Sequence, residues 1–391
     1  MSEPIARLAA LVRTAGTFVP FYRRHWAIAR HGVPRIRCQE DFEALPLVTK
    51  QDLVNAAPAE LIDQRYANRT LHAERTSGSS GQVFEMHYSA SARRRRQLRF
   101  LRALVGAGYR PGLSLMIISS QTTATIVARQ RWGHWLRWSY ADLDDAPVRL
   151  AATFETTRPD ILYGPLSALL ELGAILEARG VAHRPHRLIS TGEQVTAGHH
   201  RRLESIFGAP LADFYGMTEF GLMAWRREGS GPYRLCSRDL HLEYLPIRYD
   251  QGLDRLIASD LRGGAQPLIR FDTGDLVRRD RALADRPVVA FVGRDHDALV
   301  LPGRQRVAPY RITSGLESIE GIRAFRVVQQ PDTSVDLYLD CGAEIAAARA
   351  RRLVTRALPG LSVRLHWQNG ALSRHPGKQS PVISLAGRQA S

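Results

Sequence analysis

The chain has 391 residues, more than a single ordinary hydrophobic core organises, so we expect two or three domains, one of them large. Its hydrophobic content of 44% and charged content of 24% are typical of a soluble globular protein; no apolar run is long enough for a membrane span or a secretory signal, which predicts a cytoplasmic protein. The net charge of +16 would suit a nucleic-acid partner, but the arginines are spread along the whole chain, so we predict none.

The segment up to about residue 70 is typical of short amphipathic helices interrupted by prolines, and Thr49 offers an N-cap for the helix after it. From residue 71 the pattern changes to short apolar segments separated by glycine and hydroxyl residues. Strands are predicted at Leu113–Ser119, Ile161–Tyr163 and Arg187–Ser190, with a helix over Leu166–Ala178. Strands that alternate with helices predict an α/β core.

A run of arginines, Arg93–Arg96 followed by Arg99 and Arg102, lies in a predicted helix that ends near Gly106 and Gly108. Consecutive side chains of a helix point in different directions, so four adjacent arginines cannot line one binding stripe. The run is therefore interpreted as a solvated helix face.

After Gly221 the pattern becomes rich in β-structure, with strands predicted at Pro232–Tyr249, Asp254–Asp260 and Pro267–Arg270. A last segment begins near Gly293 and combines short strands with a helix over Ala343–Leu358. The sequence thus predicts a mixed α/β fold. A large N-terminal domain of β-sheets flanked by helices covers residues 1–292, and a small C-terminal α+β domain covers residues 293–391.

Five segments carry residues suited to nucleotide chemistry. Thr76–Gly81 combines glycines with hydroxyl side chains and suits a phosphate loop, although it lacks the Gly-Lys ending of a Walker loop. Asp213–Glu219 places an aromatic ring, a hydroxyl and a carboxylate close together, which suits purine stacking and Mg²⁺ binding. Arg270–Leu276 holds an acid after a Thr-Gly turn, which suits ribose hydroxyls. Gly293–Asp297 and His375–Lys378 complete the set.

Lysine is nearly absent from this basic protein. Of 54 lysines and arginines, only Lys50 and Lys378 are lysines. A bias this strong means that positions indifferent to the choice of cation have become arginine. The two lysines are therefore candidates for sites that need a compact ammonium rather than a planar guanidinium. Chance survival on the surface is the alternative for either one.

The order of the five segments resembles the motifs of the adenylate-forming superfamily, which includes acyl-CoA synthetases, luciferases and peptide-synthetase adenylation domains. Pro20-Phe21-Tyr22, Leu45–Lys50, Ser190–Glu193 and Pro267–Arg270 look like its phenylacetate–coenzyme A ligase branch. The resemblance covers essentially the whole chain. It implies an ATP-dependent ligase that activates a carboxylic acid as its acyl-adenylate, releases pyrophosphate, and passes the acyl group to a thiol with release of AMP.

The resemblance also implies a role for each matching residue. Lys378 is expected to bridge the acid's carboxylate and the α-phosphate, Thr218 to contact the same two groups, and Glu219 to bind Mg²⁺. Tyr215 is expected to stack on adenine, whereas Lys50 falls in a structural motif outside the site. The residues expected to hold ATP are Thr76, Ser77, Gly78, Ser79, Ser80, Gly81, Gly192, Glu193, Tyr215, Gly216, Asp275 and Arg294.

The acid and the acceptor are left open. The acceptor of the acyl group is either coenzyme A or, alternatively, a carrier-protein phosphopantetheine or an amine in a biosynthetic pathway. A further alternative is a non-catalytic protein that keeps the fold. A small acid is expected, and an aromatic one is favoured if Trp132, Trp135, Trp138 and Tyr140 line its pocket, although such a cluster is more often simply part of a core. A homodimer stays open. The resemblance further implies that the small C-terminal domain is mobile and rotates about a hinge at His296.

Overall fold

The computed structural model describes residues 3–75, 84–119, 137–143, 145–229, 231–285, 287–368 and 381–388. The predicted phosphate loop, Thr76–Gly81, lies outside these residues, as do Lys378, Trp132 and Trp135. Within the described ranges, no helix is both long and apolar enough to cross a membrane.

The chain begins with short helices, as predicted. Prolines occupy the first turn of two of them, Pro20 and Pro58, where no backbone N–H is required. Thr49 caps a third helix: its hydroxyl accepts from the amide of Asp52 at 3.2 Å, and its amide donates to the Asp52 carboxylate at 2.8 Å. These elements are α1 (Glu3–Phe18), α2 (Pro20–His25), α3 (Ile28–His31), α4 (Gln39–Glu43), α5 (Lys50–Asn55), α6 (Pro58–Leu61) and η1 (Gln64–Tyr66).

A mainly parallel sheet forms the α/β core. Its described strands run in the order β4-β3-β5-β6-β7-β8-β9, in which β4 to β7 are parallel and the last two antiparallel. The strands are β3 (Leu115–Ser119), β4 (Trp138–Asp142), β5 (Ile161–Pro165), β6 (Arg187–Thr191), β7 (Leu211–Met217), β8 (Gly221–Arg226) and β9 (Arg234–Leu235).

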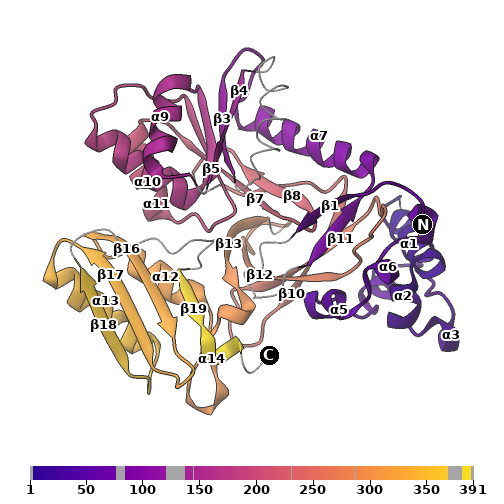
Figure 1. Ribbon diagram of the computed structural model, residues 1–391. Coiled ribbons are helices and arrows are strands. Elements are labelled where there is room, and N and C mark those ends of the chain that lie inside the picture. Colours follow the sequence, from indigo (N-terminus) through magenta and orange to yellow (C-terminus); the bar gives the residue numbers. More distant parts are fainter. Residues whose placement is uncertain are drawn as a thin grey trace.

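Helices cover both faces of this sheet (Figure 1). Alternate residues of β3 face opposite ways: Met116 packs with α9 (Pro147–Thr157), α10 (Leu166–Ala178) and α11 (Ala197–Phe207), whereas Leu115 packs under α7 (Ala90–Ala107). The sequence predicted α10 correctly.

The arginine run lies on α7, but its interpretation as a wholly solvated face is wrong. Arg93 and Arg94 are exposed, whereas the side chain of Arg96 is 17% exposed and Arg99 is 8% exposed. Residues three apart share one face of a helix, so Arg96 and Arg99 turn together toward the protein while their neighbours face water.

A second large sheet is antiparallel, with the order β10-β11-β12-β13, and packs against the N-terminal helices. Its strands are β10 (Leu240–Pro246), β11 (Asp254–Asp260), β12 (Phe271–Arg279) and β13 (Val288–Arg294). A two-stranded sheet, β1 (His72–Arg75) with β2 (Glu85–Tyr88), lies nearby (Figure 1).

The predicted strand at Pro267–Arg270 is wrong. The amide of Ile269 donates to the Tyr22 hydroxyl at 2.8 Å, and the amide of Arg270 donates to the Ser259 hydroxyl at 2.8 Å. Arg270 also has a positive φ of 50°. Because its amides bond to side chains and its backbone turns, this segment serves as an anchor, and strand pairing begins only at Phe271.

The C-terminal unit has its own sheet, order β18-β17-β16-β19, and its own hydrophobic cluster. Figure 1 shows it beside the rest of the protein. The prediction of a large sheet-rich part and a small α+β part is confirmed. The remaining elements are η2 (Asp295–Asp297), β14 (Leu299–Val300), η3 (Pro302–Arg304), β15 (Arg306–Val307), α12 (Pro309–Glu317), β16 (Ile322–Gln329), β17 (Val335–Cys341), α13 (Glu344–Ala357), β18 (Val363–Gln368), β19 (Val382–Ser384) and α14 (Leu385–Arg388).

Candidate active site

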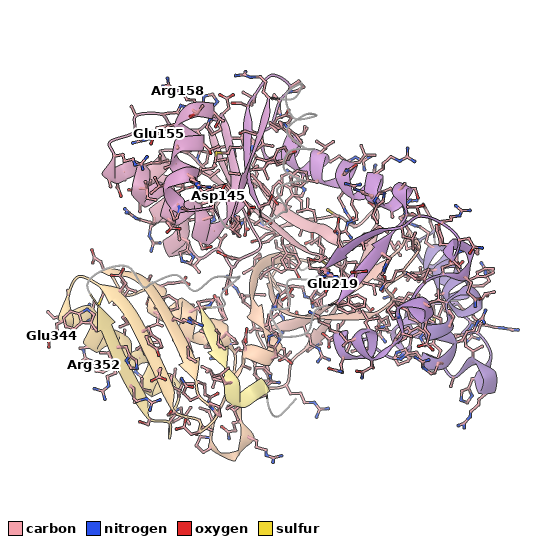
Figure 2. The ribbon with its side chains drawn as sticks, in the orientation of Figure 1. Asp145, Glu155, Arg158, Glu219, Glu344 and Arg352 are labelled. Atoms are coloured by element: carbon pink, nitrogen blue, oxygen red, sulfur yellow. The ribbon has the colours of Figure 1, made fainter. Side chains whose placement is uncertain are left out.

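The β7–β8 hairpin carries four of the predicted site residues. Tyr215 and Gly216 lie in the last, turn-proximal part of β7, which ends at Met217, and Thr218 and Glu219 lie in the turn that follows. Glycine is required at 216 because a Cβ there would lie 2.6 Å from the carbonyl oxygen of Gly221 on the facing strand. The close approach of the two strands thus fixes where the turn, and Glu219 with it, projects. Figure 2 shows Glu219 near the middle of the molecule.

A bulge in β12 presents the acid of the Thr-Gly-Asp motif. Thr273–Asp275 stands opposite Leu256 of β11 alone, and the Thr273 hydroxyl donates to the Leu256 carbonyl at 2.8 Å. Gly274 has a φ of +71°, a conformation that favours glycine. The Thr-Gly turn is therefore a bulge inside a strand, and it re-aims the Asp275 side chain.

Tyr215, Asp275 and Arg294 meet between the two large sheets. The Tyr215 hydroxyl donates to Oδ2 of Asp275 at 2.5 Å, and Arg294 Nε lies 3.3 Å from Oδ1 of the same carboxylate. The Tyr215 ring stacks on Phe291 of β13, with centroids 3.5 Å apart and planes inclined by 11°. Burial and the adjacent Asp275 carboxylate raise the pKa of Tyr215, so its hydroxyl keeps its proton.

Glu219 is a buried acid with two positively charged side chains nearby. It is 8% exposed, and burial raises its pKa above the ordinary value, whereas the positive charges of Lys50 and Arg294 lower it. The Asp275 carboxylate acts in the same direction as burial. Loss of a nearby cation would therefore favour the protonated form of Glu219.

The structure brings Lys50 to this site, although its motif places it outside. The amide of Val48 donates to the carbonyl of Arg270 at 3.0 Å, and the amide of Asp272 donates to the carbonyl of Val48 at 2.8 Å. This parallel bridge holds the start of α5 beside β12. Lys50, the first residue of α5, has its pKa lowered by burial, an effect that the Glu219 carboxylate opposes. The scarcity of lysine was the sequence signal that could have identified it.

Gly192 and Glu193 follow β6. Gly192 has a φ of +77°, which turns the chain at the end of the strand. The Glu193 carboxylate accepts from the amide of Ser167 at 2.7 Å and from its hydroxyl at 2.8 Å, at the start of α10. The acid therefore ties β6 to a helix N-terminus, where a negative charge is favoured.

The aromatic residues predicted to line an acyl pocket are, where described, part of the core. Tyr140 is 9% exposed and belongs to the cluster under α7. Trp138 packs against that cluster and donates through Nε1 to the Tyr109 hydroxyl at 3.0 Å. The core interpretation therefore holds for both residues.

A carboxylate alone fits Mg²⁺ better than it fits a transition metal. The described part of the chain contains no group of three or more His, Cys, Asp or Glu side chains able to hold a metal ion. Mg²⁺ commonly uses one or two carboxylates and completes its shell with water and substrate phosphates. Glu219, a hard oxygen donor, fits this pattern.

The C-terminal unit also contacts the α/β core. Glu317, at the end of α12, lies near Thr196, the N-cap of α11, and near Arg201. Burial raises the pKa of Glu317 to about 7, although Thr196 and Arg201 both oppose that rise. This contact joins two parts of the protein through a group that titrates near neutral pH.

Comparison with known proteins gives one curated relative and several related folds. No family model matches the chain. A phenylacetate–coenzyme A ligase from Pseudomonas putida is 25% identical over 417 residues, covering 97% of this chain and 92% of that protein. ATP-bound MatB from Rhodopseudomonas palustris has a TM-score of 0.55 at 17% identity, covering 81% of this chain and 67% of that structure.

A 2-hydroxyisobutyryl-CoA ligase has been solved in more than one state. In the postadenylation state, in complex with R3-HIB-AMP, it matches with a TM-score of 0.77 at 22% identity, covering 97% of this chain and 88% of that structure. In the thioesterification state, in complex with 2-HIB-AMP and CoA, the TM-score is 0.64 at 21% identity, with the same coverage. The overall arrangement here therefore resembles the postadenylation state more than the thioesterification state.

The sequence match, the fold match and the order of the motifs agree with one another over nearly the full length of the chain. The site lies where the motifs converge, between the α/β core and the antiparallel sheet. The chain is therefore similar in sequence to a phenylacetate–coenzyme A ligase, and it has the fold of the solved acid–coenzyme A ligases named above.

Proposed function

We propose that this chain is an acid–coenzyme A ligase that activates a small carboxylic acid with ATP as the acyl-adenylate and then transfers the acyl group to a thiol. The observation that carries the proposal is the meeting of Tyr215, Asp275 and Arg294 from three strands beside Glu219. The match to a phenylacetate–coenzyme A ligase over 97% of the chain supports the same activity.

The chemistry of the first step explains the arrangement of charge. A carboxylate is a poor electrophile, and joining it to AMP turns one of its oxygens into a good leaving group. The enzyme must bring two anions together and hold them in line, so positioning and charge screening supply most of the rate acceleration. In this proposal Asp275 and Arg294 hold the ribose, and the Tyr215–Phe291 stack offers adenine a flat aromatic platform.

The cations of the site screen the two anions. Glu219 holds Mg²⁺, which screens the phosphate charges when bound. Lys50 favours the ionised form of Glu219 and adds positive charge at the same edge. Lys378 and the hydroxyl-rich loop Thr76–Gly81 supply the remaining contacts to the carboxylate and the phosphates, as their motifs imply. An ammonium on a flexible stem can follow charge as it develops in the transition state.

The second step needs a different arrangement of the protein. We propose that residues 293–391 rotate as a mobile domain against residues 1–292 after the adenylate has formed, about the hinge at His296. The similarity to a postadenylation state supports the view that the arrangement described here belongs to the adenylate-forming half of the cycle.

A single assay series tests the proposal and its alternatives. Purified protein is incubated with ATP, Mg²⁺ and a panel of small aliphatic, hydroxy and aromatic acids, and the acyl-adenylate and the thioester formed with coenzyme A are measured by mass spectrometry. We expect adenylate with at least one acid and thioester when coenzyme A is added. Adenylate without thioester would favour a carrier protein or an amine as the acceptor. Formation of neither would contradict the enzymatic assignment.

A further inference from the structure

The inner face of α7 touches the turn that carries Glu219. α7 runs along β8, and a side chain at Gly106 of α7 would collide with the Trp225 ring of β8. Arg96 and Arg99 lie on the same face of the helix and reach the turn between β7 and β8. The arginine run therefore contains two residues that have a partner inside the protein.

These two arginines and one tyrosine bind three consecutive carbonyl groups of the turn. Arg96 Nη2 donates to the Thr218 carbonyl at 2.7 Å, and its Nη1 donates to the Glu219 carbonyl at 3.3 Å. Arg99 Nη2 donates to the Phe220 carbonyl at 2.5 Å. The Tyr88 hydroxyl donates to the Thr218 carbonyl at 2.5 Å.

Packing fixes the position of Arg96. Its guanidinium carbon lies 4.1 Å from the centroid of the Tyr88 ring, a cation–π contact. Gly221, which ends the turn, has a φ of +71°, and a Cβ there would lie 3.0 Å from Arg96 Nε. The absence of a side chain at this glycine thus makes room for the guanidinium against the backbone.

Backbone carbonyls are unusual partners for buried guanidinium groups. Arg99 is 8% exposed, and burial lowers its pKa because the charged form has lost water. No carboxylate of the described residues lies within ion-pair distance of Arg99. A carbonyl dipole offsets the loss of hydration less well than a carboxylate would, so an apolar side chain would cost less at this position. Arg96 Nη2 also lies 3.5 Å from the Glu74 carboxylate, whereas among the described residues Arg99 bonds to the turn alone, and its contribution is a fixed turn.

We propose that Tyr88, Arg96 and Arg99, here called the turn clamp, are positioning residues that hold Thr218 and Glu219 where Mg²⁺ and the α-phosphate of ATP bind. This inference rests on the proposed function. The turn clamp acts through carbonyl groups, so it leaves the Thr218 hydroxyl and the Glu219 carboxylate free for substrate. It also links the turn to β2, the strand that follows Thr76–Gly81 in the sequence.

The test compares Arg96→Gln with Arg94→Gln. Arg94 is exposed on the same helix, so the pair controls for the loss of one positive charge from α7. The readout is the Mg²⁺ concentration at half-maximal acid-dependent ATP–pyrophosphate exchange. We expect Arg96→Gln to raise it about tenfold, the loss typical of one charge-assisted hydrogen bond, with partial recovery of the rate at saturating Mg²⁺. Arg94→Gln should match the unmodified protein, and Arg96→Lys should fall between.

Tyr88→Phe gives a second, milder variant that removes only the hydroxyl. If both residues act on the same carbonyl, the effects of Tyr88→Phe and Arg96→Gln on the Mg²⁺ requirement will be less than additive when combined. Strict additivity would contradict a shared action on the turn.

The result that would overturn the inference is a lower rate or less folded protein for Arg96→Gln at an unchanged Mg²⁺ requirement, because a merely structural role predicts that pattern. The proposed function would then still stand. If none of the acids supports pyrophosphate exchange by the unmodified protein, the proposed function fails. Calorimetric titration with ATP in the presence and absence of Mg²⁺ then replaces the exchange assay as the readout. Equal Mg²⁺ enhancement of ATP binding in the Arg94 and Arg96 variants would then overturn the inference as well.

Discussion

The hydroxyl of Tyr215 donates a 2.5 Å hydrogen bond to Asp275, the carboxylate that also lies 3.3 Å from Arg294. Both carboxylate oxygens of Asp275 therefore already have a partner before any ribose binds. A nucleotide must share Asp275 with the tyrosine hydroxyl or displace it. The ring and the hydroxyl of Tyr215 thus have separable contributions.

Substitution of Tyr215 should separate these contributions. Tyr215→Phe keeps the ring that stacks on Phe291 and frees one oxygen of Asp275, so the KM for ATP should change less than about threefold. Tyr215→Leu removes the aromatic face and should raise the KM for ATP about five- to tenfold. ATP titrations of pyrophosphate exchange measure both. Equal losses in the two variants would show that the hydroxyl, and not the ring, carries the binding.

Lys50 should control the ionisation of Glu219. Its positive charge lowers the pKa of the buried acid, so Lys50→Met should raise that pKa and move the acid limb of the pH–rate profile to higher pH. The loss of adenylation should consequently be larger at pH 6 than at pH 8. Lys50→Arg keeps the charge and should show a smaller displacement. Superimposable pH profiles for the three proteins would place Lys50 outside the site.

Arg270 should be among the most costly residues to truncate. It is 5% exposed, pairs with Glu243 at 2.8 Å, and donates to the carbonyls of Glu43 and Leu45, which fastens the N-terminal helices to β12. Arg270→Ala leaves Glu243 buried without its partner and should lower the free energy of unfolding by about 3–5 kcal/mol.

Urea denaturation of Arg270→Ala, Glu243→Ala and the double variant measures this effect. The double variant should be less destabilised than the sum of the single ones, because it leaves no unpaired buried charge. A loss below about 1 kcal/mol in Arg270→Ala would show that the anchor is dispensable.

Glu317 should make the balance between the two half-reactions depend on pH. Its pKa of about 7 in this arrangement lies above the ordinary value, so the protonated form is favoured here. The stabilisation is complete below the ordinary pKa and is lost as pH rises through about 7. Because burial disfavours the charged form, keeping Glu317 packed against α11 should become less favourable between pH 6 and pH 8, which eases rotation of the C-terminal unit.

Glu317→Gln is the matched neutral variant for this prediction. Glutamine stays neutral, so at both pH values this variant should behave as the unmodified protein does at pH 6. The ratio of adenylation to thioester formation should then no longer change between pH 6 and pH 8. If the ratio still changes in Glu317→Gln as it does in the unmodified protein, another group is responsible, and His296 at the hinge is the candidate to replace next.

The sequence predicted the elements whose signal is local. The helix Leu166–Ala178 and the cap at Thr49 follow from apolar periodicity and from short-range capping chemistry, and both are present. Pro267–Arg270 was mistaken for a strand because its apolar residues fit one. Only the fold supplies the Tyr22 and Ser259 hydroxyls that take its amide hydrogen bonds instead.

The site was less accessible to sequence reasoning because it depends on contacts between distant segments. Motif order located Tyr215, Asp275 and Arg294, which the structure brings together. The inward turn of Arg96 could not be read from a run of four arginines, because the choice of the buried face depends on where β8 lies. Lys50 was visible as a rare lysine, but its place beside Glu219 follows from the bridge between Val48 and β12.

The central claim is that this protein forms an acyl-adenylate with the help of Lys378, and acid-dependent ATP–pyrophosphate exchange tests it most directly. The measurement compares the unmodified protein with Lys378→Ala and Lys378→Arg on whichever acid supports exchange. We predict exchange in the unmodified protein and a loss of about two orders of magnitude or more in both variants, with ATP binding retained. Exchange that persists at full rate in Lys378→Arg, or is absent with every acid, would contradict the account.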